Sequence, residues 1–172
     1  IIRGEREKLK EAQRADFQIV SAQIFDVLLA ANIDVRNVMY APENIYTIFQ
    51  DVRRNEVSYY DLDKTMRLVV LLDDVPSCYL TLGYLHQLWR PIPGWFDDYI
   101  AVPRDNLYRS LHTSVIHQNG QHLKLRFRTV AMDKVDEIGI LARWLYKGTP
   151  LWTKDISDRV EAFLENISGN IN

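Results

Sequence analysis

The sequence predicts an α+β fold in which a small mixed β-sheet is flanked by helices. Apolar residues step by three or four from residue 5 to about residue 31, which is the spacing of an amphipathic helix. Residues 68–72 form a continuous apolar run, as expected for a strand covered on both faces. Residues 110–117 and 122–128 are predicted strands, and Asn119-Gly120 between them is a strong hairpin signal. Helices therefore bracket a sheet within one chain.

Each element before the hairpin has its own signal. Asn32 is the expected end of the first helix, and residues 33–40 are a short predicted strand. Pro42 opens a predicted second helix whose last apolar residue is Val52, and residues 53–64 are predicted to be a polar loop. After the apolar strand, Pro76 starts a helix whose predicted inward residues are Cys78, Tyr79, Leu82, Leu85, Leu88 and Trp89.

The remaining elements follow from proline, glycine and periodicity. Residues 90–94 contain two prolines and a glycine, so they do not continue a helix. Residues 99–102 are predicted as a short strand and 103–108 as a loop. Helical spacing returns over residues 132–146 and again in a last helix near the end of the chain. We expect one domain over residues 1–147 and a C-terminal helical extension over 148–172.

Composition excludes several classes of protein. The chain has 172 residues and a formal net charge of −2, which gives no global attraction to nucleic acid or to an anionic membrane. Its single cysteine, Cys78, excludes an internal disulfide and fits a reducing cytoplasm. We therefore expect a cytoplasmic protein with no membrane partner and no direct contact with nucleic acid. Because it opens Ile-Ile-Arg-Gly without methionine, neighbouring domains of a longer chain are the expected protein partners.

The second hairpin strand concentrates positive charge on one of its faces. Side chains alternate along a strand, so the apolar residues at 123, 125 and 127 share one face. The other face carries His122, Lys124, Arg126 and Arg128. Such a stripe attracts anions. Alternatively, it is a solvated outer face paired with scattered carboxylates.

Four motifs in order resemble the synthetase domain of the RelA/SpoT family: Leu-Trp-Arg-Pro-Ile-Pro-Gly (88–94), Phe-Asp-Asp-Tyr-Ile-Ala (96–101), Asn-Leu-Tyr-Arg-Ser-Leu-His-Thr (106–113) and Arg-Thr (128–129). The resemblance runs from roughly Glu5 to Lys147. It implies a nucleotidyltransferase-like core, and an activity that moves a pyrophosphoryl group from ATP to the 3′-hydroxyl of GDP or GTP. The products of that reaction are the alarmones ppGpp and pppGpp.

The residues expected to hold ATP and metal depart from the family pattern. A basic stretch that grips the ATP phosphates reads Ala41 and Glu43 where the family has arginine and lysine. The metal-binding aspartate falls on Leu62, with Asp61 and Asp63 as candidate substitutes on either side. The family's second carboxylate, a glutamate, is Lys124, which is no Mg²⁺ ligand. We therefore expect no metal site and no cofactor, with Mg²⁺ needed only if the chain is active.

The positions that embrace the guanine nucleotide in the family are better kept. Leu107 replaces a glycine there, which would distort the loop if that glycine has a positive φ. Tyr108 and His112 have ordinary alternatives, as a packed aromatic and a satisfied strand histidine. The predicted nucleotide-binding residues are Arg104, Asn106, Tyr108, Ser110, His112, Lys124 and Arg126.

Three functions are compatible with this pattern. The first is a catalytically silent synthetase-like domain that still binds a guanine nucleotide or an alarmone in a regulatory role. The second is an active GTP pyrophosphokinase of low rate that uses Asp61 or Asp63. The third is a structural interaction module whose former pocket has no ligand.

Overall fold

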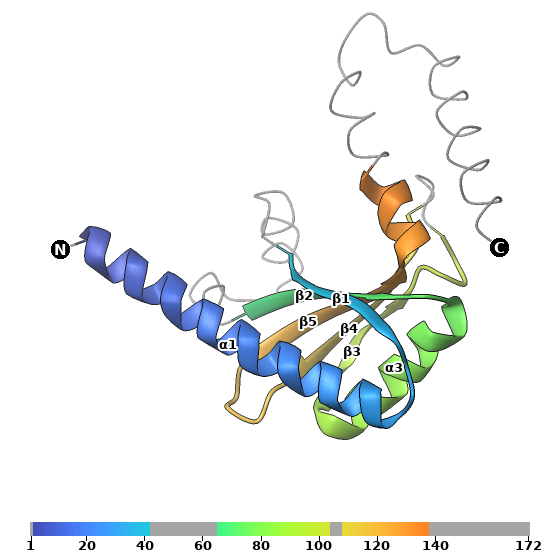
Figure 1. The fold of residues 1–172 in the computed structure, drawn as a ribbon, viewed down its shortest axis with the longest axis horizontal. Helices are drawn as coiled ribbons and strands as arrows, with labels where there is room; N and C mark the ends of the chain where they lie inside the picture. The colour runs from blue at the N-terminus through green and yellow to red at the C-terminus, as the bar shows by residue number, and fades with distance from the viewer. Residues whose placement is uncertain (1, 42–64, 104–107, 138–172) are drawn as a thin grey trace, which may run out of the picture.

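A five-stranded mixed sheet organises the molecule (Figure 1). The computed structural model describes residues 2–41, 65–103 and 108–137. The strand order is β1-β2-β5-β4-β3, and only the β2–β5 pair is parallel among the pairs of this sheet. The strands are β1 (Val35–Tyr40), β2 (Thr65–Leu72), β3 (Arg90–Asp98), β4 (Leu111–Ile116) and β5 (His122–Thr129). The predicted α+β class is confirmed.

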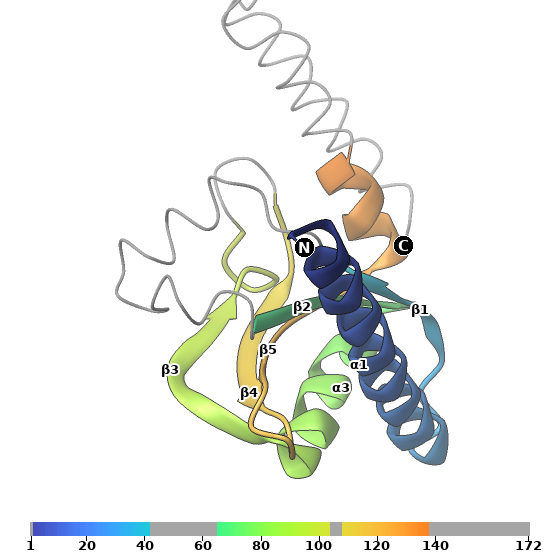
Figure 2. The same cartoon turned by 90° about the vertical axis from the view of Figure 1, so that its left-hand side faces the viewer.

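Helices α1 (Ile2–Ala30) and α3 (Val75–Leu88) pack on the same face of this sheet, and Figure 2 shows both beside the curved strands. Every residue of β2 is buried, as the apolar run predicts. Alternate residues of the strands point toward the helices and form the core with them. Fully buried members of this core include Ile24, Leu28, Leu68, Val70, Leu85, Leu123 and Phe127. The intervening residues of the same strands point to the other face of the sheet, away from α1 and α3.

Two predicted chain reversals are confirmed. Asn32 follows α1 with a φ of 55°, a left-handed conformation that asparagine tolerates and that ends helices. Gly120 has a φ of 82° in the hairpin between β4 and β5, where its lack of a side chain permits this angle. The Asn119 side chain accepts a hydrogen bond from the Gln121 amide at 2.9 Å, which closes the turn.

Residues 90–94 do not continue a helix, as predicted, but the strand that begins there was not predicted. β3 accommodates Pro91 and Pro93 because it is an edge strand and its pairing shifts register between Pro91 and Phe96. Two other expectations are wrong. Residues 99–102 form a turn, since the Asp98 carboxylate accepts hydrogen bonds from two backbone amides there. Tyr79 does not face inward; it is 38% exposed.

Some predicted elements lie outside the described residues: the helix from Pro42, the loop over 53–64, the last helix and the domain boundary at residue 147. The helix predicted over 132–146 is described only to residue 137, and residues 130–137 are helical.

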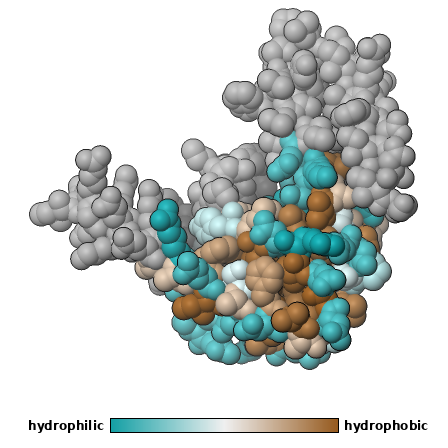
Figure 3. Space-filling view, in the orientation of Figure 1, coloured by the Kyte–Doolittle hydropathy of each residue, from teal (hydrophilic) through white to brown (hydrophobic). Residues whose placement is uncertain are grey.

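The side of the molecule that carries α1 is mixed in character, and Figure 3 shows apolar side chains among polar ones there. On α1 itself, Ile19 and Leu29 are exposed. No helix among the described residues is both long and apolar enough to cross a membrane.

Candidate functional site

Two rows of polar side chains cross the face of the sheet that points away from α1 and α3. Residues paired across adjacent strands share a face, so the strand register defines the rows. One row runs from β2 through β5 to β4 and consists of Arg67, Lys124 and Ser114. The next row runs from β5 through β4 to β3 and consists of Arg126, His112 and Asp97. The predicted alternation of β5 is thereby confirmed, and the sheet brings Arg67 beside Lys124, which sequence reasoning missed.

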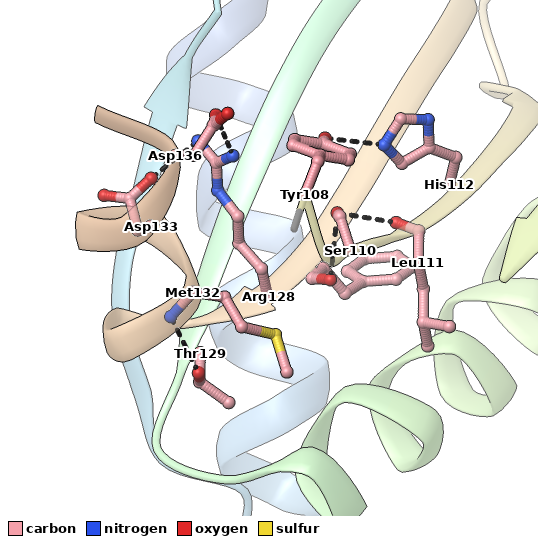
Figure 4. Close-up of polar contacts among 10 residues, drawn as sticks. Tyr108, Ser110, Leu111, His112, Arg128, Thr129, Met132, Asp133 and Asp136 are labelled. Carbon is pink, nitrogen blue, oxygen red and sulfur yellow. Dashed lines mark hydrogen bonds and ion pairs between the residues drawn. The ribbon is translucent and has the colours of Figure 1, made fainter. Parts of the chain in front are cut away.

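Arg128 lies at the end of the cationic stripe but is enclosed by two carboxylates (Figure 4). Its guanidinium nitrogens lie 2.6 Å from Asp133 and 2.6 Å from Asp136, and its side chain is only 8% exposed. Asp133 and Asp136 belong to the helix over residues 130–137. Thr129 caps this helix by accepting a hydrogen bond from the Met132 amide at 3.2 Å. The Arg-Thr motif therefore fastens the helix over residues 130–137 to β5. Lys124 and Arg126 are the other two cations of the stripe.

Trp95 covers the middle of the stripe. Its indole ring lies under the Lys124 ammonium, with Nζ 4.6 Å from the ring centroid. The same indole meets the His122 ring at 5.1 Å between centroids and 68° between planes. Sequence reasoning did not include Trp95 among the site residues, because it predicted no strand at this point. The available signal was its place between two of the family motifs.

Three aromatic rings gather around His112, the middle residue of the second row. The Tyr108 hydroxyl and His112 Nε2 are 2.7 Å apart and share a hydrogen bond (Figure 4). Tyr99 meets both rings edge-on, at 6.1 Å from Tyr108 and 5.1 Å from His112 between centroids. Tyr108 and His112 are both half-buried. Tyr99 is a further member of this site that the sequence did not single out.

Ser110 has a structural role in this geometry. It is fully buried, and its hydroxyl lies 3.1 Å from the Phe127 carbonyl and 3.3 Å from the Leu111 carbonyl, to which it donates. It thereby joins the beginning of β4 to the end of β5. The other candidate positions lie outside the described residues: Glu43, Asp61, Leu62, Asp63, Arg104, Asn106 and Leu107.

Asp98 anchors the turn that carries Tyr99. One carboxylate oxygen accepts hydrogen bonds from the amides of Ile100 and Ala101 at 3.0 and 2.8 Å. The other accepts from the Tyr79 hydroxyl of α3 at 2.9 Å. Partial burial acts to raise the pKa of Asp98, but these three hydrogen bonds outweigh it and hold the pKa below its ordinary value. Partial burial and the adjacent carboxylate raise the pKa of Tyr79.

This anchor predicts a measurable pH dependence. A carboxyl group whose pKa is lowered by folding stabilises the fold above its unfolded pKa and loses that effect as the pH falls through the folded pKa. Asp98→Asn keeps an acceptor for the turn but has no charge to lose. We expect wild type to be more stable than D98N at pH 7, by under about 1 kcal/mol at this solvent-screened position. The difference should shrink as the pH falls from about 4, the ordinary pKa of aspartate, through the lower pKa of the folded state. Urea unfolding at a series of pH values measures it; a difference that stays constant with pH would contradict it.

The described residues of this face do not fit a magnesium ion. Mg²⁺ requires hard oxygen ligands in near-octahedral geometry. Within residues 2–41, 65–103 and 108–137, no three His, Cys, Asp or Glu side chains are placed to hold a metal ion together. The centre of the face instead carries the Lys124 ammonium between Arg67 and Ser114. This donor set suits an anion.

A match to a protein family identifies the family of this chain. Residues 41–150 match the model of the region found in RelA / SpoT proteins. The chain belongs to the RelA/SpoT family. Over 132 residues this RelA/SpoT domain is 40% identical to a GTP pyrophosphokinase from Streptomyces antibioticus, covering 75% of this chain and 15% of that protein. Over 148 residues it is 32% identical to a guanosine-3′,5′-bis(diphosphate) 3′-pyrophosphohydrolase from Aquifex aeolicus, covering 78% and 21%. The chain thus spans about a fifth or less of these relatives.

Solved structures confirm the fold of the RelA/SpoT domain. A GTP pyrophosphokinase family protein from Streptococcus pneumoniae superposes with a TM-score of 0.70 at 19% identity, over 97% of this chain and 89% of that one. Small alarmone synthetase 1 from Bacillus subtilis, bound to its product pppGpp, superposes with a TM-score of 0.67 at 17% identity, over 96% and 92%. The predicted synthetase fold is therefore correct.

Proposed function

We propose that this RelA/SpoT domain binds a guanine nucleotide or alarmone without magnesium and does not catalyse pyrophosphoryl transfer. One observation carries the proposal: Lys124 lies between Arg67 and Ser114 on the polar face. The family resemblance aligns this lysine with a metal-binding glutamate. An ammonium there takes the place of both the carboxylate and its ion, since it offers positive charge directly to phosphate oxygens.

Charge along the face supports a diphosphate as ligand. Lys124 and Arg126 are two residues apart on β5, and Arg67 is the direct neighbour of Lys124 on β2. Strands are about 4.8 Å apart and alternate residues about 6–7 Å apart, so these three cations are close enough together to face one diphosphate group. Arg128 is excluded from this role because Asp133 and Asp136 already neutralise it.

The aromatic rings support a base beside the phosphate. His112 is the cross-strand partner of Arg126, and the Tyr108 hydroxyl shares a hydrogen bond with the His112 ring. Stacking of a base on an aromatic side chain contributes roughly 1–3 kcal/mol. We include Arg104 and Asn106 by the family resemblance, and omit Ser110 because its hydroxyl is engaged by the backbone. A synthetase-like domain over residues 1–147, with an extension over 148–172 and neighbouring domains as partners, completes the proposal.

Calorimetry with GDP and with ppGpp, in EDTA and then in magnesium, tests this function. We expect binding in EDTA, because Lys124 supplies the positive charge that a metal ion would otherwise bring. Lys124→Met should weaken it by about 10-fold, as expected for one lost charge-assisted hydrogen bond. Lys134→Met is the matched control, since Lys134 is exposed on the helix over residues 130–137 and should have no effect.

Two results would contradict the proposal. Binding that appears only when magnesium is added would return the site to the metal-dependent family pattern. No binding by wild type, with Tyr108→Ala unchanged in every property measured, would favour an interaction module instead.

A further inference from the structure

Trp95 reaches the cationic strand from two strands away. Pairing of β3 with β4 slips between Pro91 and Phe96, and Gly94 within this bulge has a φ of 81°. Pairing resumes with Phe96 opposite Thr113, so Trp95 is the last residue before the regular pairing. On β4, Ser114 is small and buried, and it is the partner of Lys124 on β5. Because β4 lies between β3 and β5 in the sheet, the indole reaches over β4 to contact β5.

The contacts of the indole are with two alternate residues of β5. Lys124 Nζ is 4.6 Å from the ring centroid, within the range of a cation–π interaction. The His122 ring lies edge-on to the same indole at 5.1 Å. The two contacts fix the ring along β5, and the ring in turn fixes the end of the lysine side chain above the sheet.

We propose that Trp95 is a positioning residue that holds the Lys124 ammonium over the polar face, ready for a diphosphate group. The inference rests on the proposed function and adds to it how the anion site is built. A lysine side chain has four rotatable bonds and loses much rotamer freedom when it binds a ligand. Because the indole already restricts it, less freedom is lost on binding, and affinity rises.

A merely structural Trp95 would cover Ser114 and brace the bulge of β3. The two roles differ in one respect: a positioning residue acts through Lys124, and a brace does not. In a double-mutant cycle, the loss of Trp95 should therefore weaken anion binding in wild type but have no further effect once Lys124 is replaced by methionine.

The experiment uses the whole chain, with inorganic pyrophosphate and GDP as probes, by calorimetry in EDTA. The variants are Trp95→Leu, Trp95→Phe, Lys124→Met and the double variant W95L/K124M. We expect W95L to weaken both probes by about 5-fold, and W95F by less, because phenylalanine forms a weaker cation–π contact than tryptophan. The matched control is Phe96→Leu, since Phe96 is the next residue of β3, is 47% exposed and points to the other face of the sheet.

A spectroscopic signature checks the contact without any ligand. The ring current of the indole should shift the ε-methylene protons of Lys124 upfield, in a signal that K124M lacks. We expect this shift in wild type, a smaller one in W95F and none in W95L. W95F also keeps an aromatic ring in the bulge, so the test stands even where W95L fails to fold.

The outcomes separate the two proposals. If wild type binds in EDTA and W95L binds equally well, or weakens binding equally in the K124M background, Trp95 is not a positioning residue and the proposed function stands. If wild type does not bind either probe in EDTA, the proposed function fails, and the positioning role fails with it. An unshifted Lys124 signal in wild type overturns the positioning role alone.

Discussion

Incubated with ATP and GDP in magnesium, this chain should form no ppGpp above the level of a variant that lacks Asp61 and Asp63. Pyrophosphoryl transfer depends on positioning and on neutralising charge with metal ions and cations. Each group that stabilises the developing charge typically contributes a factor of about 10²–10³. The family resemblance aligns Lys124 and Leu62 with its two carboxylates, so the proposed loss of both predicts a rate at least about 10⁴-fold below an intact synthetase.

The controls make this result decisive. The GTP pyrophosphokinase from Streptomyces antibioticus, assayed with the same labelled ATP, provides the positive reaction. The variant Asp61→Ala with Asp63→Ala provides the baseline. A labelled ppGpp product from wild type that disappears in this double variant would show an active enzyme of low rate, and the proposed silence would be wrong.

Replacing Arg128 with methionine should cost more stability than any other single change in the cationic stripe. Its side chain is 8% exposed and contacts Asp133 and Asp136, which are 13% and 19% exposed. Methionine leaves two carboxylates side by side with no counter-charge. Removing one partner of a buried ion pair costs about 3–5 kcal/mol. At about 2–4 °C per kcal/mol for a chain of this size, the melting temperature should fall by roughly 10 °C.

Arg36→Met is the matched control, because Arg36 forms a two-contact ion pair with Asp73 at the exposed surface. Solvent screens such pairs, so its melting temperature should change little. Adding Asp133→Asn and Asp136→Asn to Arg128→Met should recover part of the loss, since it removes the unpaired charges. If Arg128→Met has the same melting temperature as wild type, the ion pairs of Arg128 do not stabilise the fold.

Local patterns predicted most of the elements correctly. The apolar stripe of α1, the buried run of β2 and the Asn-Gly hairpin each depend on neighbours a few residues away. Such signals survive without knowledge of the rest of the chain. The strand β3 was missed for the same reason: Pro91 and Pro93 forbid regular pairing locally, and only the position of β3 at the sheet edge makes them acceptable.

The sequence by itself determined the family of this chain and its class of fold, because motifs and residue identities are written along the chain. The tertiary structure alone decided which charges act together. Arg128 is neutralised by carboxylates of the helix that follows it. Arg67 lies beside Lys124 across a parallel strand pair, and Trp95 reaches Lys124 over β4. Electrostatic and aromatic contacts depend on distance in space, which strand order and register set and which sequence spacing does not.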